Sequence, residues 1–267
     1  MQRRSPMAGD AIDELRAVIA SGDAMLFTGA GFSGDARDMD GKRLPDSREM
    51  IGELWKICFP DDEPDDSSLP DLYDVALMRA PDALRDYVAR RLRIGNAKLP
   101  AHFRRWFSAP WQRIYTLNVD DLEVAVQRQF ELPRKLRSVS AMAPDRSRAE
   151  PGAIDVVHLN GMAGADASEL TFSTMQYASR LCGRDREYER LVADLLRAPF
   201  VFAGTTLDEV ILWQHLELHR RRNGDPEPHS RAFLISSSLS RARRELLASL
   251  HIDWIQASID EVADQIL

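Results

Sequence analysis

The stretch AMLFTGAGFSG (residues 24–34) joins a short apolar run directly to a glycine-rich turn. The apolar run predicts a buried strand, Ala24 to Thr28, and the turn matches the general G-x-G-x-x-G pattern of dinucleotide-binding folds. Gly29 and Gly31 let the backbone turn tightly and approach a pyrophosphate, whose charge is then met by backbone N–H groups. A plain strand-to-loop turn uses the same glycines, so this stretch by itself leaves both interpretations open.

Strands and helices alternate through much of the remaining chain. Further strands are expected at residues 113–117, 136–140, 154–159, 200–203, 232–235 and 253–256, and helices are expected to start near Asp121, Glu187, Asp208, Ser240 and Asp260. Residues 224–228 predict a turn before one of these strands. Such alternation implies a mostly parallel sheet covered on both faces. We therefore expect an α/β protein with a doubly wound, parallel, Rossmann-like sheet and no zinc module.

Residues 35–110 carry an interrupted helical pattern, with helices opening near Ser47 and Pro81. We expect a helical insert over about residues 35–110, within one domain that spans residues 1–267. Glu49 lies where an ordinary dehydrogenase fold would bind a ribose, but no second strand–helix unit surrounds it. The aromatic run between residues 103 and 111 is expected to be core.

Composition is typical of a globular protein in a reducing compartment. The 267 residues have 44% hydrophobic content and a net charge of −7, which argues against a general nucleic-acid-binding surface. Cys58 and Cys182 are the only cysteines, too few for a disulfide framework or a structural zinc site. No run approaches the roughly 18 apolar residues of a membrane span. We expect a cytoplasmic protein that contacts neither nucleic acid nor membrane.

Polar residues follow two of the later strands. In TLNVDD (residues 116–121), strand alternation places Thr116, Asn118 and Asp120 on one side, where an amide and a carboxylate can meet a sugar or a water. Asp121 can instead cap the following helix.

The strand expected at residues 154–159 runs into HLNG (residues 158–161). His158 and Asn160 are two residues apart, so both side chains are expected on the same face. His158 is then either a catalytic imidazole or a satisfied structural histidine. The remaining histidines fall on helices or turns, and we expect them to be structural or solvent-facing.

Together these motifs resemble the sirtuin family, in particular the bacterial sirtuin-like domains that serve as NAD-hydrolysing effectors in anti-phage systems. GAGFS (residues 29–33) resembles the opening GAG-x-S of that family, and TLNVD resembles its T-x-N-x-D. Thr171 and Tyr177 resemble the segment after the family's histidine motif. FAGTTLD (residues 202–208) resembles its late glycine turn, which faces the NAD phosphates and ribose.

The resemblance implies that NAD is the substrate and that no metal is required. It assigns NAD contacts to Gly29, Ala30, Gly31, Ser33, Asn118, Asp120, Asn160, Gly204, Thr205 and Asp208. It assigns catalysis to Asn118, which orients a water and the ribose, together with Asp120 and His158. The implied reaction hydrolyses the nicotinamide–ribose bond to nicotinamide and ADP-ribose. A regulated effector of this kind implies an activating partner protein or further domain, and an oligomer is compatible with it.

The sequence departs from the family pattern at three points, and these departures leave two other functions open. The two C-x-x-C zinc pairs of the deacylase branch are absent, and residues 34–45 lack the family's Gly-Ile-Pro-Asp-Phe-Arg loop. The family's histidine directly precedes a glycine, whereas here Asn160 precedes Gly161. An NAD-dependent protein deacylase and a module that holds NAD or ADP-ribose without turnover are the alternatives. We expect His158 and not Asn160 to supply the titrating group, because an amide does not exchange a proton near neutral pH.

Overall fold

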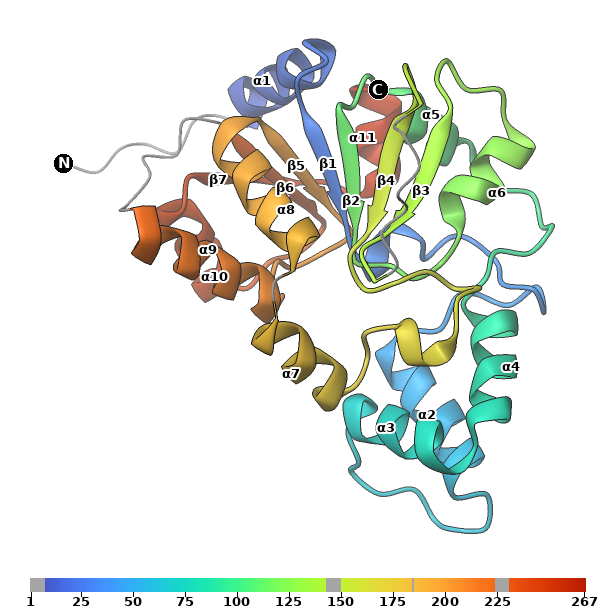
Figure 1. The fold of residues 1–267 in the computed structure, drawn as a ribbon. Coiled ribbons are helices and arrows are strands. Elements are labelled where there is room, and N and C mark those ends of the chain that lie inside the picture. The colour runs from blue at the N-terminus through green and yellow to red at the C-terminus, as the bar shows by residue number, and fades with distance from the viewer. Residues whose placement is uncertain (1–7, 143–149, 184, 224–230) are drawn as a thin grey trace.

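The computed structural model describes residues 8–142, 150–183, 185–223 and 231–267. Its centre is a seven-stranded sheet in which all neighbouring strands are parallel, in the order β3-β4-β2-β1-β5-β6-β7 (Figure 1). The strands are β1 (Met25–Thr28), β2 (Arg113–Thr116), β3 (Leu136–Ser140), β4 (Ile154–His158), β5 (Phe200–Ala203), β6 (Ala232–Ser236) and β7 (Ile252–Gln256). Each lies where the sequence predicted a strand, and the expected α/β class with a Rossmann-like parallel sheet is confirmed. The turn expected at residues 224–228 lies outside the described residues.

Helices cover both faces of the sheet because the strand residues alternate between two apolar clusters. Leu26 and Val156 belong to the cluster that includes helices α1, α5, α6 and α11, whereas Phe27 and Val157 belong to the cluster that includes α8, α9 and α10. The bounds of these helices are α1 (Ala8–Ala20), α5 (Ala101–Ser108), α6 (Leu122–Gln129), α8 (Arg186–Arg197), α9 (Val210–Asn223), α10 (Arg241–Ser249) and α11 (Ile259–Gln265). Among the described helices, none combines the length and the apolarity that crossing a membrane requires.

Three helices of the region expected as an insert form most of an apolar cluster that is separate from the two clusters on the sheet. They are α2 (Ser47–Cys58), α3 (Leu69–Arg79) and α4 (Pro81–Arg91), and they lie beyond one end of the strands in Figure 1. Their cluster also takes in Val119 and buried residues between 163 and 170. Helix α5 does not belong to this three-helix cluster, because its Phe103 and Trp106 pack into the cluster under the sheet. These aromatic residues were predicted to be core, and they are. Helix α7 (Thr174–Cys182) was not predicted from the sequence.

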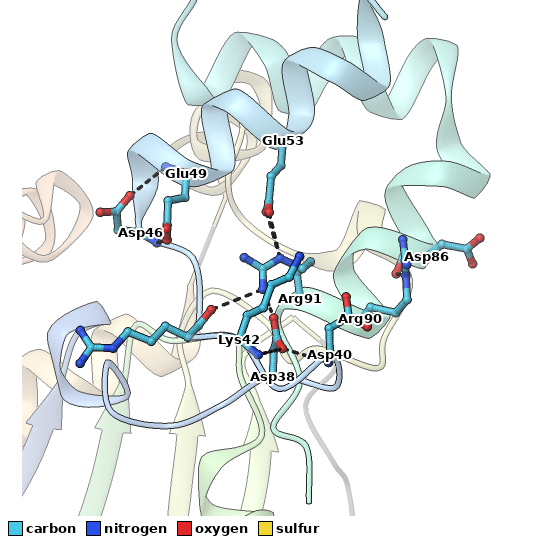
Figure 2. A network of polar contacts seen from close by, with 10 residues as sticks. Asp38, Asp40, Lys42, Asp46, Glu49, Glu53, Asp86, Arg90 and Arg91 are labelled. Carbon is cyan, nitrogen blue, oxygen red and sulfur yellow. Dashed lines mark hydrogen bonds and ion pairs between the residues drawn. The ribbon is translucent and has the colours of Figure 1, made fainter. Parts of the chain in front are cut away.

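A buried ion-pair network ties the loop after β1 to this three-helix unit (Figure 2). The guanidinium of Arg91 on α4 contacts the carboxylate of Asp38, and its Nε lies 3.1 Å from both carboxylate oxygens of Glu53 on α2. Asp38 Oδ1 in turn accepts hydrogen bonds from the backbone N–H groups of Asp40 and Lys42, at 2.9 and 2.8 Å. Removing one partner from such a buried pair leaves the other charge buried and uncompensated, which is costly. The contacts of Arg91 therefore hold the loop against helices α2 and α4.

Candidate functional site

Two glycine turns meet where β1 and β5 end, next to the point at which the strand order reverses. The N–H of Gly29 donates to Ala203 O at 3.1 Å, and the N–H of Gly31 donates to Gly204 O at 2.9 Å. A Cβ on Gly29 would lie 2.8 Å from Thr205 Cβ, and Gly204 combines a φ of +68° with a hypothetical Cβ 2.2 Å from Phe32 N. Open α/β sheets bind their ligands at this place, outside the carboxyl ends of the strands.

These hydrogen bonds change the interpretation of the glycines. The amides of Gly29 and Gly31 bond to carbonyls of the neighbouring turn, and the amide of Phe32 bonds to Gly29 O. We expected such N–H groups to meet a pyrophosphate, but these three are occupied within the protein. Gly29 and Gly204 are needed because two backbone turns pack in contact.

A cleft of about 770 Å³ opens over the two turns, within the range of roughly 300–1,000 Å³ that is usual for ligand pockets. Eight of the residues predicted to contact NAD line it: Gly29, Ala30, Gly31, Asn118, Asn160, Gly204, Thr205 and Asp208. The opposite wall includes Ser47, Leu69 and Pro70 from the starts of α2 and α3. The cleft therefore lies between the carboxyl edge of the sheet and the three-helix unit.

Three other predicted site residues lie behind the cleft. Ser33, Asp120 and His158 line a separate internal cavity of about 10 Å³, no larger than one water. Their exposed fractions are 2%, 8% and 1%. The structure thus divides the predicted site into a cleft that can hold a ligand and a buried polar cluster beneath it.

Asn118 is the residue that lines both the cleft and the cavity. Its Nδ2 donates to Ser33 Oγ at 2.9 Å, and Ser33 hydrogen-bonds the carboxyl group of Asp120. An ionised carboxylate only accepts, so Ser33 donates to Asp120 and accepts from Asn118. This order fixes the amide of Asn118 and leaves its Oδ1 without a hydrogen-bond partner among the described residues.

His158 is held between two acceptors. Its Nδ1 lies 2.9 Å from the carbonyl oxygen of Asn118, and its Nε2 lies 3.1 Å from Oε1 of Glu123 on α6. A carbonyl oxygen and a carboxylate both accept, so both ring nitrogens donate and the ring is an imidazolium. Burial lowers the pKa of His158, but the Glu123 carboxylate and the Asn118 carbonyl outweigh it and raise the pKa overall. Such a ring has no lone pair with which to take a proton from a ligand.

The expectation that His158 and Asn160 share a strand face is wrong. Strand β4 ends at His158, and residues 159 and 160 form a turn, so the alternation of side chains stops before Asn160. His158 therefore points into the buried cluster, and Asn160 lines the cleft.

The carboxyl groups beside His158 have shifted pKa values of opposite sign. Burial raises the pKa of Asp120 to about 6, against the lowering effect of the hydrogen bond from Ser33. Burial also acts to raise the pKa of Glu123, but the charge and hydrogen bond of His158, together with the hydroxyl of Ser138, lower it overall. Glu123 therefore stays ionised beside the imidazolium, while Asp120 titrates near the edge of the physiological range.

Asn160 joins three segments at the cleft wall. Its Nδ2 donates to Leu117 O at 3.2 Å, and its Oδ1 accepts from Nη1 of Arg180 on α7 at 3.3 Å. The same Nη1 donates to Leu159 O at 2.6 Å and to Thr171 Oγ1 at 3.1 Å. Sequence reasoning missed Arg180, since no motif marks it.

The cleft also contains residues that motif analysis did not single out. Tyr177 was noted only for its resemblance and lines the wall from α7. Glu209 lines it beside Asp208, and burial, reinforced by the charge of Asp208, raises the pKa of Glu209. Three consecutive serines, residues 236–238, begin at the last residue of β6 and also line the cleft. Their position at the end of a strand that was predicted correctly was the one available signal.

Comparison with known families gives one match. A family model described as a SIR2-like domain matches residues 112–255, more than half of the chain. The matched region contains Asn118, His158, Asn160 and the turn at Gly204, whereas the glycine turn after β1 lies outside it. The search of curated proteins found no match.

Proposed function

The chain belongs to the SIR2-like domain family, which supports an NAD-related role, and from this premise we propose that it binds NAD in the cleft and hydrolyses the nicotinamide–ribose bond. The observation that carries the proposal is the position of Asn118, whose oriented amide faces a ligand-sized cleft at the carboxyl edge of the sheet. The pyrophosphate would lie over the turns at Gly29 and Gly204, and the nicotinamide ribose near Asn118.

The proposed reaction needs polar stabilisation more than proton transfer. The nicotinamide of NAD is a pyridinium, so it leaves as a neutral molecule when its bond to the ribose breaks, and no acid has to protonate it. The ribose then carries oxocarbenium character, which a fixed dipole stabilises. Asn118 Oδ1 can accept a hydrogen bond from a ribose hydroxyl or from the attacking water. That water releases one proton to the solvent as ADP-ribose forms, so the products are neutral nicotinamide, ADP-ribose and one proton.

His158 takes a different role in this proposal from the one that its sequence suggested. It holds the backbone carbonyl of Asn118 and is itself held by Glu123, so it acts as a positioning residue and not as a general base. Asp120 likewise acts through Ser33 on the amide of Asn118.

A second candidate function is binding of NAD or ADP-ribose without turnover. It is favoured by Asn160, which stands before Gly161 at the cleft wall and whose amide is bonded at both ends. Asn160, and not the imidazole of His158, is the side chain of the HLNG segment that lines the cleft. Protein deacylation is disfavoured, because two cysteines cannot form the four-cysteine zinc site of that branch.

The resemblance extends the proposal to a biological setting. We place the protein in the cytoplasm as a regulated effector of bacterial anti-phage defence, where a partner protein or an assembly would control NAD loss. Cys58 and Cys182 are unpaired in the structure, which agrees with a reducing compartment.

Nicotinamide release measured by mass spectrometry tests the proposal. The wild-type chain is expected to convert NAD to nicotinamide and ADP-ribose, and Asn118→Ala is expected to abolish this. Asn96→Ala, which alters an exposed asparagine outside the cleft lining, is the matched control and should keep wild-type turnover. NAD binding without nicotinamide release would favour the second candidate, and comparable turnover in Asn118→Ala would refute the role of Asn118.

A further inference from the structure

Three side chains from distant parts of the sequence meet at the rim of the cleft. Asp35 follows the first glycine turn, His102 lies in α5 and Asp260 lies in α11. Each offers one oxygen or nitrogen atom, and these atoms all lie within 4.8 Å of one another. His102 Nδ1 contacts Asp260 Oδ1, and the His102 side chain is only 6% exposed. An imidazole is thus held rigidly in the wall while two carboxylates converge on it.

The cleft around this group has an excess of negative charge. Its lining includes four carboxylates, those of Asp35, Asp208, Glu209 and Asp260, and no Lys or Arg among the described residues. The pyrophosphate of a dinucleotide would add further negative charge. A cleft of this composition repels such a ligand unless a cation accompanies it.

We propose that Asp35, His102 and Asp260 bind a divalent transition-metal ion at the rim of the cleft. One imidazole nitrogen and two carboxylate oxygens form a mixed donor set that suits Mn²⁺ or Zn²⁺, whereas Mg²⁺ and Ca²⁺ prefer oxygen ligands alone. Ligand atoms that share one ion at the usual bond lengths of about 2.0–2.3 Å lie roughly 3–4 Å apart. The three atoms here lie within 4.8 Å of one another, so small side-chain rotations bring them to one ion.

The remaining coordination positions of the ion would face the cleft. Asp35 and Asp260 both line it, and His102 approaches from the protein side. Three protein ligands with open positions are typical of a metal that also contacts a ligand or water. The ion would therefore offset the carboxylates and offer a contact to a phosphate oxygen.

The simpler interpretation is an ion pair between His102 and Asp260. It accounts for those two residues but not for Asp35, whose carboxylate approaches a second carboxylate at a cost in repulsion. Even a protonated imidazole would offset only one of the two negative charges. A divalent ion offsets both, which is why the third residue favours the metal site.

Metal binding by the full chain tests this inference without any assay of NAD. After removal of bound ions with a chelator, the wild type is titrated with Mn²⁺ alone, with free Mn²⁺ read by electron paramagnetic resonance, and with Zn²⁺ alone by calorimetry. We expect one ion per chain. Asp35→Asn should weaken its binding at least about tenfold, since even residues that only orient metal ligands typically contribute about 10–100-fold.

Asp264→Asn is the matched control, because Asp264 is an exposed acid on the same helix as Asp260 and pairs with Arg105 outside the cluster. It should bind Mn²⁺ as the wild type does. His102→Gln should also lose the ion, with circular dichroism to confirm that the fold is intact. The proposal is overturned if the wild type binds neither ion, or if Asp35→Asn binds as tightly as the control. The result does not depend on the proposed hydrolysis, because the readout is the metal itself.

Discussion

Replacing His158 by leucine should destabilise the fold strongly, because the change strands a buried charge. The side chains of His158 and Glu123 are 1% and 2% exposed, and their ring nitrogen and carboxylate oxygen lie 3.1 Å apart. Removing one partner of a buried pair typically costs about 3–5 kcal/mol, since the other charge remains without solvent or a counter-ion. We expect a loss of that size in the free energy of unfolding.

Urea denaturation at pH 7, followed by circular dichroism, measures this loss. A double variant with leucine at both His158 and Glu123 is the control. It removes both charges, so it should cost less than His158→Leu alone. A loss below about 1 kcal/mol for the single variant would refute the buried imidazolium, because neutral hydrogen bonds contribute on that scale.

The pH dependence of this effect has a definite sign. The pKa of His158 is raised above its ordinary 6.5, so its stabilisation is fully present below pH 6.5 and is lost as the pH rises through the folded-state pKa. The pKa of Glu123 is lowered below its ordinary 4.5, so its stabilisation is present above pH 4.5 and is lost as the pH falls through the folded-state pKa. The difference between wild type and His158→Leu should be largest between these limits. A difference that grows steadily above pH 8 would contradict the assignment.

Gly204→Ala should lower the free energy of unfolding by more than the roughly 1–2 kcal/mol that a positive φ costs, because its Cβ would lie 2.2 Å from a backbone nitrogen. Gly41→Ala is the control in the same denaturation assay. Gly41 has a φ of +76° with open space around it, so this change should cost only the roughly 1–2 kcal/mol of the positive φ. Arg91→Ala should lower the free energy of unfolding by about 3–5 kcal/mol, because it breaks a buried ion pair. Arg85→Ala breaks an exposed pair on the same helix and should lower it by less than about 1 kcal/mol. Equal losses for the two variants would count against the buried network. NAD affinity should fall as the pH drops through about 6, where Asp120 becomes protonated. Protonated Asp120 no longer requires Ser33 to donate to it, so Ser33 no longer fixes the amide of Asn118. Calorimetry at pH 5 and pH 7.5 measures the two affinities, and equal values would exclude the role of Asp120.

The strands could be predicted because their signals are local. Each is a short apolar run bounded by turn residues, and the alternation of these runs with helices predicts that the strands run parallel. The order in which they pair, β3-β4-β2-β1-β5-β6-β7, came only from the structure. The segment of α5 was harder, because its apolar periodicity says that one face is buried but not against what. Phe103 and Trp106 lie under the sheet, and only the tertiary structure separates them from the helices of the insert.

The site was predictable in outline but not in its division between cleft and interior. Asn118 and Gly204 follow strands, and the carboxyl ends of parallel strands meet at one edge, so their proximity followed from the sequence. The burial of His158 did not, because it depends on β4 ending one residue earlier than predicted and on Glu123 reaching it from α6. Ser47 lines the cleft because the inserted helices lie over the carboxyl edge of the sheet, and no sequence motif predicts that placement.

The most direct test of the central claim is calorimetric titration of the folded, purified chain with NAD. We predict one NAD bound per chain, displaced by ADP-ribose, because the cleft of about 770 Å³ is the one built from the two glycine turns and Asn118. The absence of any binding heat at millimolar NAD, in a sample shown to be folded, would contradict the account.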